Sequence, residues 1–273
     1  MAFEIEVDLS GNYTSGVIKN TTRGNIEKIR IETGPDALAS LLKCIEEGAK
    51  KFNLSAQDLL GKTKSVRLRA PEIITDTLSD KNGARVGLIV SQGHEKNAYF
   101  EGHDENPIMD FIVTRDRIVG IKEEMNHKGD ALLEPSEGEV KQKVRYLLEF
   151  GSGIIVVSLK NATINPTNER LVKEIIEHDY PRHYLGAVPV LVASDFSSEK
   201  DDFLRTNVCL FNAYTWFRLD HLLRSTEAFL QKNGYNYGLL VTQADGVSEY
   251  IHRVTPIKTS ASDQTAFVRS MVR

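Results

Sequence analysis

Hydrophobic and acidic residues alternate with a period of two at the start of the chain, and this pattern predicts β-strands. Residues 3–9 alternate in this way and run into Ser10-Gly11-Asn12, a sequence typical of a hairpin turn. Two further strands are expected over residues 13–18 and 27–32, with a second turn at 21–25. The chain is therefore expected to begin with three antiparallel strands.

After Gly34-Pro35 the apolar residues are spaced three and four apart, which predicts an amphipathic helix over residues 38–52. Strands and helices then alternate, as they do in α/β proteins. The expected order is strand 66–68, helix 71–79, strand 86–91, helix 135–150, strand 154–159, helix 167–176, strand 188–192, helix 200–232 and strand 237–242. Residues 92–134 show little periodicity apart from a possible strand near 117–121, so an irregular excursion is expected there.

The charge balance argues against nucleic acid and membranes as partners. The chain has 273 residues, and its 34 basic and 38 acidic side chains leave a formal charge of −4, without the cationic surface that such partners need. No apolar stretch approaches the roughly 20 residues that cross a bilayer. Acidic residues also interrupt the N-terminal apolar pattern, unlike the continuous run of a signal peptide. A cytoplasmic location is expected.

Several classes of site are not supported by the sequence. The only cysteines, Cys44 and Cys209, lie in predicted helices, so neither a disulfide framework nor a paired-cysteine zinc site is expected. The histidines lack the spacing of metal ligands, and the cluster His103-Asp104-Glu105 is interpreted as a solvated loop. The Gly-x-Ser-x-Gly motif of serine hydrolases is missing. No metal site is predicted and no catalytic residue is assigned.

The first hairpin carries groups that can bind a phosphate. Backbone N–H groups and hydroxyls in a tight turn can approach a phosphate closely, and a carboxylate at a strand end can hold magnesium through water. A strand ending in Asp8, then Gly11, Thr14 and Gly16 in a hairpin, then the order βββαβα, resembles the actin, sugar kinase and heat-shock chaperone superfamily. This resemblance implies an α/β, ribonuclease H-like N-terminal lobe with a mixed sheet and flanking helices. The same residues also describe an ordinary surface hairpin.

Motifs further along the chain sharpen the resemblance. They are Gly83-Ala84-Arg85-Val86, Asn165-Pro166-Thr167-Asn168-Glu169, Leu204-Arg205-Thr206 with Asn212-Ala213-Tyr214, and Gln243-Ala244-Asp245-Gly246. In this order they resemble the hydantoinase A and 5-oxoprolinase family, and within it a small accessory subunit such as the epsilon subunit of acetophenone carboxylase. The resemblance spans a single domain over residues 1–253, followed by a tail at 254–273. It covers only the front part of the longer family chain.

The resemblance implies positions for a nucleotide and a substrate. The phosphate set would comprise Asp8, Gly11, Asn12, Thr14, Ser15, Asp245 and Gly246, and the substrate-cavity set Arg205, Thr206 and Asn212. Two plainer readings stay open, because Asp-Gly is ordinary turn sequence and Arg205 can pair with Asp201 or Asp202.

The chain also departs from the family pattern. In the first hairpin Ser10, Asn12 and Ser15 replace a glycine, a threonine and an aspartate of the family. The segment Arg69-Ala70-Pro71-Glu72 stands where the family has His-Gly-Thr-Thr, and Asn168 replaces a family histidine. Several groups needed for independent turnover are therefore altered.

In the superfamily, two lobes close on the nucleotide, and the family continues beyond residues 256–259 into a second lobe that is not expected here. Tight ATP binding by the isolated chain is therefore not expected. The resemblance implies a subunit of an ATP-dependent ketone carboxylase, which forms a 3-oxo acid from an aromatic or small ketone and bicarbonate. ATP and Mg²⁺ would serve the complex, and larger hydantoinase A-like and hydantoinase B-like subunits would be the partners. The alternatives are a catalytically silent scaffold or regulatory module and an independent small phosphotransferase.

Overall fold

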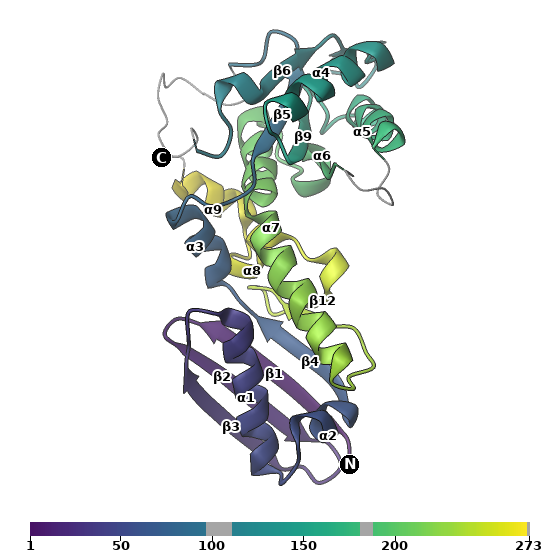
Figure 1. Ribbon diagram of the computed structural model, residues 1–273. Helices are drawn as coiled ribbons and strands as arrows, with labels where there is room; N and C mark the ends of the chain where they lie inside the picture. The colour runs from purple at the N-terminus through teal and green to yellow at the C-terminus, as the bar shows by residue number, and fades with distance from the viewer. Residues whose placement is uncertain (97–110, 181–187, 272–273) are drawn as a thin grey trace. The chain divides into compact units, whose positions relative to one another are not determined.

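The computed structural model describes residues 1–96, 111–180 and 188–271, and the chain divides into two compact units (Figure 1). Unit 1 comprises Met1–Asp80 and Phe217–Ser262, and unit 2 comprises Lys81–Trp216 and Asp263–Arg273. Each unit thus combines segments that are far apart in the sequence. The expectation of one domain over residues 1–253 stays a prediction.

Unit 1 is built on a six-stranded mixed sheet in the order β12-β11-β4-β1-β2-β3. Its strands are β1 (Phe3–Ser10), β2 (Tyr13–Asn20), β3 (Ile26–Glu32), β4 (Thr63–Arg69), β11 (Leu240–Thr242) and β12 (Ser248–Tyr250). β1, β4 and β11 are parallel neighbours, whereas β2 is antiparallel to β1 and β3, and β12 is antiparallel to β11. The prediction of three antiparallel strands at the start is confirmed.

The alternation along β1 explains how unit 1 forms its core. Phe3, Ile5, Val7 and Leu9 are buried, and the residues between them point to the opposite face. Helix α1 (Ala37–Lys51) contacts β1, β2 and β3, and its first turn is capped by the Asp36 carboxylate (Figure 1). The unit also contains α2 (Ala56–Gly61), α3 (Glu72–Ser79), the 3₁₀ turn η2 (Ile251–Arg253) and α8 (Pro256–Ser260).

Unit 2 is built on a four-stranded parallel sheet in the order β10-β9-β5-β6. The strands are β5 (Val86–Ser91), β6 (Ile118–Ile121), β9 (Ile154–Ser158) and β10 (Val190–Val192). Helices α4 (Glu137–Glu149) and α5 (Thr167–Asp179) pack on one face of this sheet and form a core with alternate strand residues. Every residue of β5 and β9 is buried, as expected for a parallel sheet covered on both faces.

The remaining elements of unit 2 are the 3₁₀ turn η1 (Arg115–Arg117), the hairpin β7 (Glu124–Met125) and β8 (Ala131–Leu133), α6 (Ala193–Phe196) and α9 (Gln264–Met271). Helix α7 (Asp202–Lys232) contributes its first part to unit 2 and its second part to unit 1. Among the helices of the described ranges, none combines the length and apolar character of a membrane span.

The strand expected near residues 117–121 is present as β6. The described residues of the excursion at 92–134 are otherwise less irregular than expected, because η1, β7 and β8 also lie there. The segment 254–273, expected as a tail, contains α8 and α9, in which Ile257 and Val268 are fully buried. The cluster His103-Asp104-Glu105 lies outside the described residues. The α/β architecture, with a mixed sheet and flanking helices, is confirmed.

Candidate functional site

The parallel strands of unit 1 end in polar residues at one edge of the six-stranded sheet. β11, β4 and β1 are parallel neighbours, so their carboxyl ends lie at the same edge. Asp8 lies near the end of β1, Arg69 ends β4, and Asp245 follows β11. The carboxyl edge of parallel strands is the usual place for ligands in open α/β sheets. The structure therefore gathers part of the predicted phosphate set in unit 1.

Asp8 belongs to a row of side chains that crosses three strands. Its register partners are Arg69 on the parallel strand β4 and Ser15 on the antiparallel strand β2. Register partners in a sheet place their side chains on the same face, where an acid and a base attract each other. The Ser10 hydroxyl donates a hydrogen bond to Oδ1 of Asp8 and so orients the carboxylate.

A two-residue turn joins β1 to β2 beside this row. Ser10 pairs with Tyr13, so Gly11 and Asn12 form the loop, and Gly11 has a φ of 65°. A type II′ turn requires a positive φ at its first central position, which explains the glycine. A Cβ atom at Gly11 would lie 3.5 Å from Oε1 of Glu72, so the Glu72 carboxylate lies against the turn.

Thr14 lies on the opposite face of the sheet from Asp8. Its side chain is fully buried, and its Oγ1 lies 3.0 Å from Oγ1 of Thr33. Its register partner, Leu9, is also part of the core. Thr14 is the one hairpin candidate whose side chain points into the core instead of toward the row of Asp8.

Asp245 and Gly246 form the turn between β11 and β12. Oδ1 of Asp245 accepts the backbone N–H of Val247 at 2.9 Å, and the N–H of Gly246 donates to the carbonyl of Gln243 at 3.0 Å. Gly246 has a φ of 85°, which glycine adopts without strain. The Asp245 carboxylate therefore shapes its own turn, in agreement with the plainer reading of Asp-Gly.

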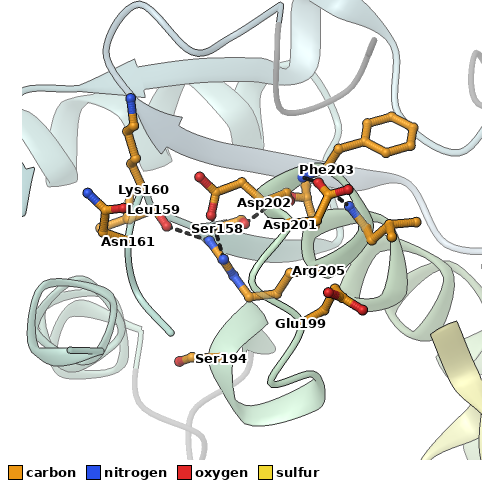
Figure 2. Close-up of polar contacts among 12 residues, drawn as sticks. Ser158, Leu159, Lys160, Asn161, Ser194, Glu199, Asp201, Asp202, Phe203 and Arg205 are labelled. Atoms are coloured by element: carbon orange, nitrogen blue, oxygen red, sulfur yellow. Dashed lines mark hydrogen bonds and ion pairs between the residues drawn. The ribbon is translucent and has the colours of Figure 1, made fainter. Parts of the chain in front are cut away.

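The residues of the predicted substrate-cavity set are fully buried in unit 2, on α7: Arg205, Thr206 and Asn212. Nη1 of Arg205 donates to Oδ1 of Asp202 at 2.5 Å, and Nη2 donates to the carbonyl oxygen of Leu159 at 2.6 Å (Figure 2). Thr206 donates from Oγ1 to the carbonyl oxygen of Asp202 at 2.6 Å. These contacts are structural, and the pairing with Asp202 is one that the sequence left open.

Two residues at the edge in unit 1 were missed as candidates. Arg69 places a cation opposite Asp8, and Glu72 places a carboxylate beside the Gly11 turn. The alternation along β4 indicates that Arg69 is exposed, but only the parallel register brings it to Asp8. Over the described ranges, no three His, Cys, Asp or Glu side chains form a metal cluster. The edge can offer a guanidinium to a phosphate, and carboxylates to the water shell of magnesium.

Comparison with known proteins relates the chain to carboxylase subunits. It is 27% identical over 274 residues to the acetophenone carboxylase gamma subunit of Aromatoleum aromaticum, covering 93% of this chain and 37% of that protein. It is 21% identical over 226 residues to the acetone carboxylase beta subunit of Xanthobacter autotrophicus, covering 76% of this chain and 29% of that protein. The chain thus spans about a third of the length of these relatives. The matched acetophenone carboxylase subunit is gamma, whereas the sequence suggested epsilon.

Two solved structures share the fold. Nucleotide-free acetone carboxylase matches with a TM-score of 0.76 and 18% identity, over 95% of this chain and 38% of that one. The ATP-dependent caprolactamase of Pseudomonas jessenii matches with a TM-score of 0.76 and 16% identity, over 90% of this chain and 36% of that one. A family model of the hydantoinase/oxoprolinase N-terminal region matches residues 4–180, which is more than half of the chain. The chain therefore belongs to the hydantoinase/oxoprolinase N-terminal region family.

Proposed function

We propose that this chain is part of an ATP-dependent ketone carboxylase of the acetophenone and acetone carboxylase type. It acts with larger hydantoinase A-like and hydantoinase B-like subunits to form a 3-oxo acid from an aromatic or small ketone and bicarbonate. The observation that carries the proposal is the edge in unit 1, where Asp8, the Gly11 turn and Arg69 meet, in a chain whose curated relatives are carboxylase subunits. ATP and Mg²⁺ are the proposed cofactors of the complex.

We further infer that the sheet of unit 1 is of the ribonuclease H-like type found in actin, sugar kinases and heat-shock chaperones. The strand order β3-β2-β1-β4-β11 supports this inference, because among these five strands only β2 runs against the others. A fold of this type is shared by proteins of many activities, so the proposed function depends on the residues at the edge.

The residues at the edge fit a magnesium nucleotide. The Arg69 guanidinium is the group that would bind phosphate oxygens, and the exposed turn at Gly11 and Asn12 offers backbone N–H groups. Asp8, oriented by Ser10, would hold magnesium-bound water, with Glu72 as a second carboxylate. Magnesium, when bound, neutralises the charge of the phosphates during phosphoryl transfer.

A second candidate is a scaffold or regulatory module of the same fold, which supplies docking surface and no chemistry. Two contacts favour it. The Thr14 hydroxyl is buried against Thr33, and the Asp245 carboxylate is used by its own turn. In that case the larger subunits would carry the whole nucleotide site.

Reconstitution separates these functions. The purified chain is mixed with candidate larger subunits, and ATP hydrolysis that depends on ketone and bicarbonate is measured with each component omitted in turn. We expect hydrolysis that requires this chain. Unchanged hydrolysis without it would support the scaffold, and hydrolysis by the isolated chain would support an independent phosphotransferase. A lactam offered in place of the ketone tests the substrate class that the caprolactamase acts on.

A variant of the edge tests the role of this chain's own residues. Asp8→Asn is expected to lower ketone-dependent ATP hydrolysis of the complex at least about tenfold, because an amide binds magnesium-bound water less strongly than a carboxylate. Glu6→Gln is the matched control, since Glu6 lies two residues earlier on the same face of β1 and is exposed. Full activity of an assembled Asp8→Asn complex would remove the nucleotide role and leave the scaffold.

A further inference from the structure

Unit 2 contains a cavity of about 760 Å³ that has no part in the proposed nucleotide site. Its lining comes mainly from three segments, each at the carboxyl end of a strand. These are Ser91–His94 at the end of β5, Lys122–His127 after β6, and Lys160 with Asn161 after β9. The cavity therefore lies at the carboxyl edge of the four-stranded parallel sheet.

The strand order makes this edge a natural crevice. β5 pairs with β6 on one side and with β9 on the other, and β10 lies beyond β9. After β5 the next strand of the sheet is β6, on one side, whereas after β9 the next strand is β10, on the other side. At such a switch point the connecting loops diverge, and ligands of open parallel sheets bind in the gap outside the strand ends.

The loop after β9 is fixed in place by buried polar side chains. The N–H of Leu159 donates to Oε1 of Glu169 at 2.8 Å. The carbonyl oxygen of Leu159 accepts from Nη2 of Arg205 at 2.6 Å (Figure 2). The N–H of Lys160 donates to Oγ of Ser91 at 2.9 Å. Glu169 and Arg205 are completely buried. The backbone that carries the Lys160 side chain is therefore held by several specific contacts, as a preorganised site requires.

Glu123 is the buried carboxylate of the cavity wall, and it is hydrogen-bonded to neighbouring side chains. Glu123 is 9% exposed, the Ser91 hydroxyl donates to its Oε1, and Nδ2 of Asn168 donates to its Oε2 at 2.7 Å. Both carboxylate oxygens thus accept hydrogen bonds from the protein. This arrangement satisfies the buried charge within the wall.

The other polar groups of the lining include two ammonium groups and two imidazoles. Lys122 and Lys160 are exposed, and Nζ of Lys160 lies 3.4 Å from Nε2 of His94. Because an ammonium group can only donate, Nε2 of His94 is the acceptor in this contact, and the ring can donate to a ligand from Nδ1. His127 adds a second imidazole, and Glu124 is the opposing acid. Ammonium and imidazole groups that meet in a crevice bind the oxygen atoms of carboxylates and phosphates.

We propose that this cavity binds a small oxyanion, a carboxylate or phosphate group of a metabolite, between Lys122, Lys160 and His94. The two lysines supply the charge, and the fixed loop after β9 sets the position of Lys160. The lining residues belong to unit 2 and include no residue of the nucleotide edge in unit 1, so the proposal does not depend on the carboxylase function. Carboxylate and phosphate groups are both oxyanions that this lining could bind, and the test below distinguishes between them.

The test uses the full chain labelled with ¹⁵N and titrated separately with inorganic phosphate, bicarbonate and acetate. We expect saturable shifts of the backbone amides of Gly93, His94 and Lys160 with at least one probe. The double variant Lys122→Met and Lys160→Met is expected to weaken that binding at least about tenfold, because two ionic contacts are lost. Lys128→Met, an exposed lysine between β7 and β8 outside the cavity lining, should bind as the wild type does.

Saturation by phosphate alone would identify a phosphate site, and saturation by bicarbonate or acetate a carboxylate site. The proposal is overturned if no probe gives saturable shifts at about 10 mM. It is also overturned if the double variant binds with unchanged affinity. Amide shifts centred on Gly11 that disappear in the Arg69→Met variant would assign the binding to the edge in unit 1. This result would also overturn the proposal.

Discussion

Arg205 on α7 and Leu159 after β9 are joined by a hydrogen bond of 2.6 Å, from the guanidinium Nη2 to the backbone carbonyl oxygen. Arg205 is completely buried and Leu159 is 1% exposed, so water cannot readily replace the donor. A hydrogen bond from a charged group contributes about 1.5–3 kcal/mol in such a setting. The bond attaches the part of α7 that belongs to unit 2 to the loop that carries Lys160.

Replacement of this arginine is expected to destabilise the protein. Arg205→Met keeps much of the side-chain volume but leaves the Leu159 carbonyl without its donor, so the free energy of unfolding should fall by about 2 kcal/mol. Urea denaturation followed by circular dichroism measures the loss. Arg224→Met is the control, because Arg224 lies on the same helix with its side chain 70% exposed and should change stability by less than about 0.5 kcal/mol. Equal losses in the two variants would contradict a specific role of Arg205.

Glu169 predicts a pH dependence of stability. Burial raises the pKa of Glu169 above its ordinary value, although the Ser194 and Leu159 contacts and Arg205 act in the opposite direction. Between the ordinary and the raised pKa, the folded chain keeps a proton that the unfolded chain has released. The free energy of unfolding contributed by this group therefore falls as the pH rises through that window.

Glu169→Gln is expected to remove this part of the pH dependence. Urea denaturation at a series of pH values from about 4 to 8 should give a flatter profile for the variant than for the wild type. Glu174→Gln, at an exposed position of the same helix, should leave the profile unchanged. A wild-type profile that rises relative to Glu169→Gln over this range would show that the pKa is lowered and would contradict the prediction.

Gly83 is expected to tolerate no larger side chain. A Cβ atom at this position would lie 2.5 Å from the backbone carbonyl oxygen of Tyr214, a contact that requires the backbone to move. Gly83→Ala should therefore lower the free energy of unfolding by about 1–3 kcal/mol. Gly138→Ala, in α4 with nothing within 4 Å of the new atom, should instead raise it by up to about 1 kcal/mol. Calorimetric unfolding distinguishes the two signs, and a neutral Gly83→Ala would contradict the close packing.

The two cysteines are expected to be unreactive in the native protein. Burial raises the pKa of Cys44 to about 11 and that of Cys209 well above its ordinary value. Since roughly one Cys44 thiol in a thousand is then ionised at pH 8, a thiol reagent should label the native chain slowly and the urea-unfolded chain at once. Rapid labelling of either cysteine without denaturant would mean that its surroundings open easily.

Local sequence patterns predicted the elements that have a clear pattern of apolar and polar residues. The alternation in β1 predicted its buried face, and the uninterrupted apolar run Val86–Ser91 predicted a fully buried strand. Short elements such as α2, α6 and β12 were missed because they contain too few residues to show a period. The irregularity of residues 92–134 was overestimated for the same reason, since β7 has only two residues.

The candidate site was less predictable because it depends on pairing between distant segments. The hairpin containing Asp8 has a local signal, but the parallel register that brings Arg69 opposite Asp8 does not. The burial of Arg205 is likewise a tertiary property, since arginine in a predicted helix is usually exposed. The cavity in unit 2 requires three strand ends to meet, which no single stretch of sequence encodes.

The division of the chain into units has a consequence for its synthesis. The ribosome releases Met1–Asp80 first, but the strands that complete the sheet of unit 1, β11 and β12, are made only after residue 239. The segment that emerges first must therefore wait, with one side of β4 unpaired, while most of unit 2 is translated. Nascent chains of this protein should need protection from aggregation for longer than chains whose domains are finished in order of translation.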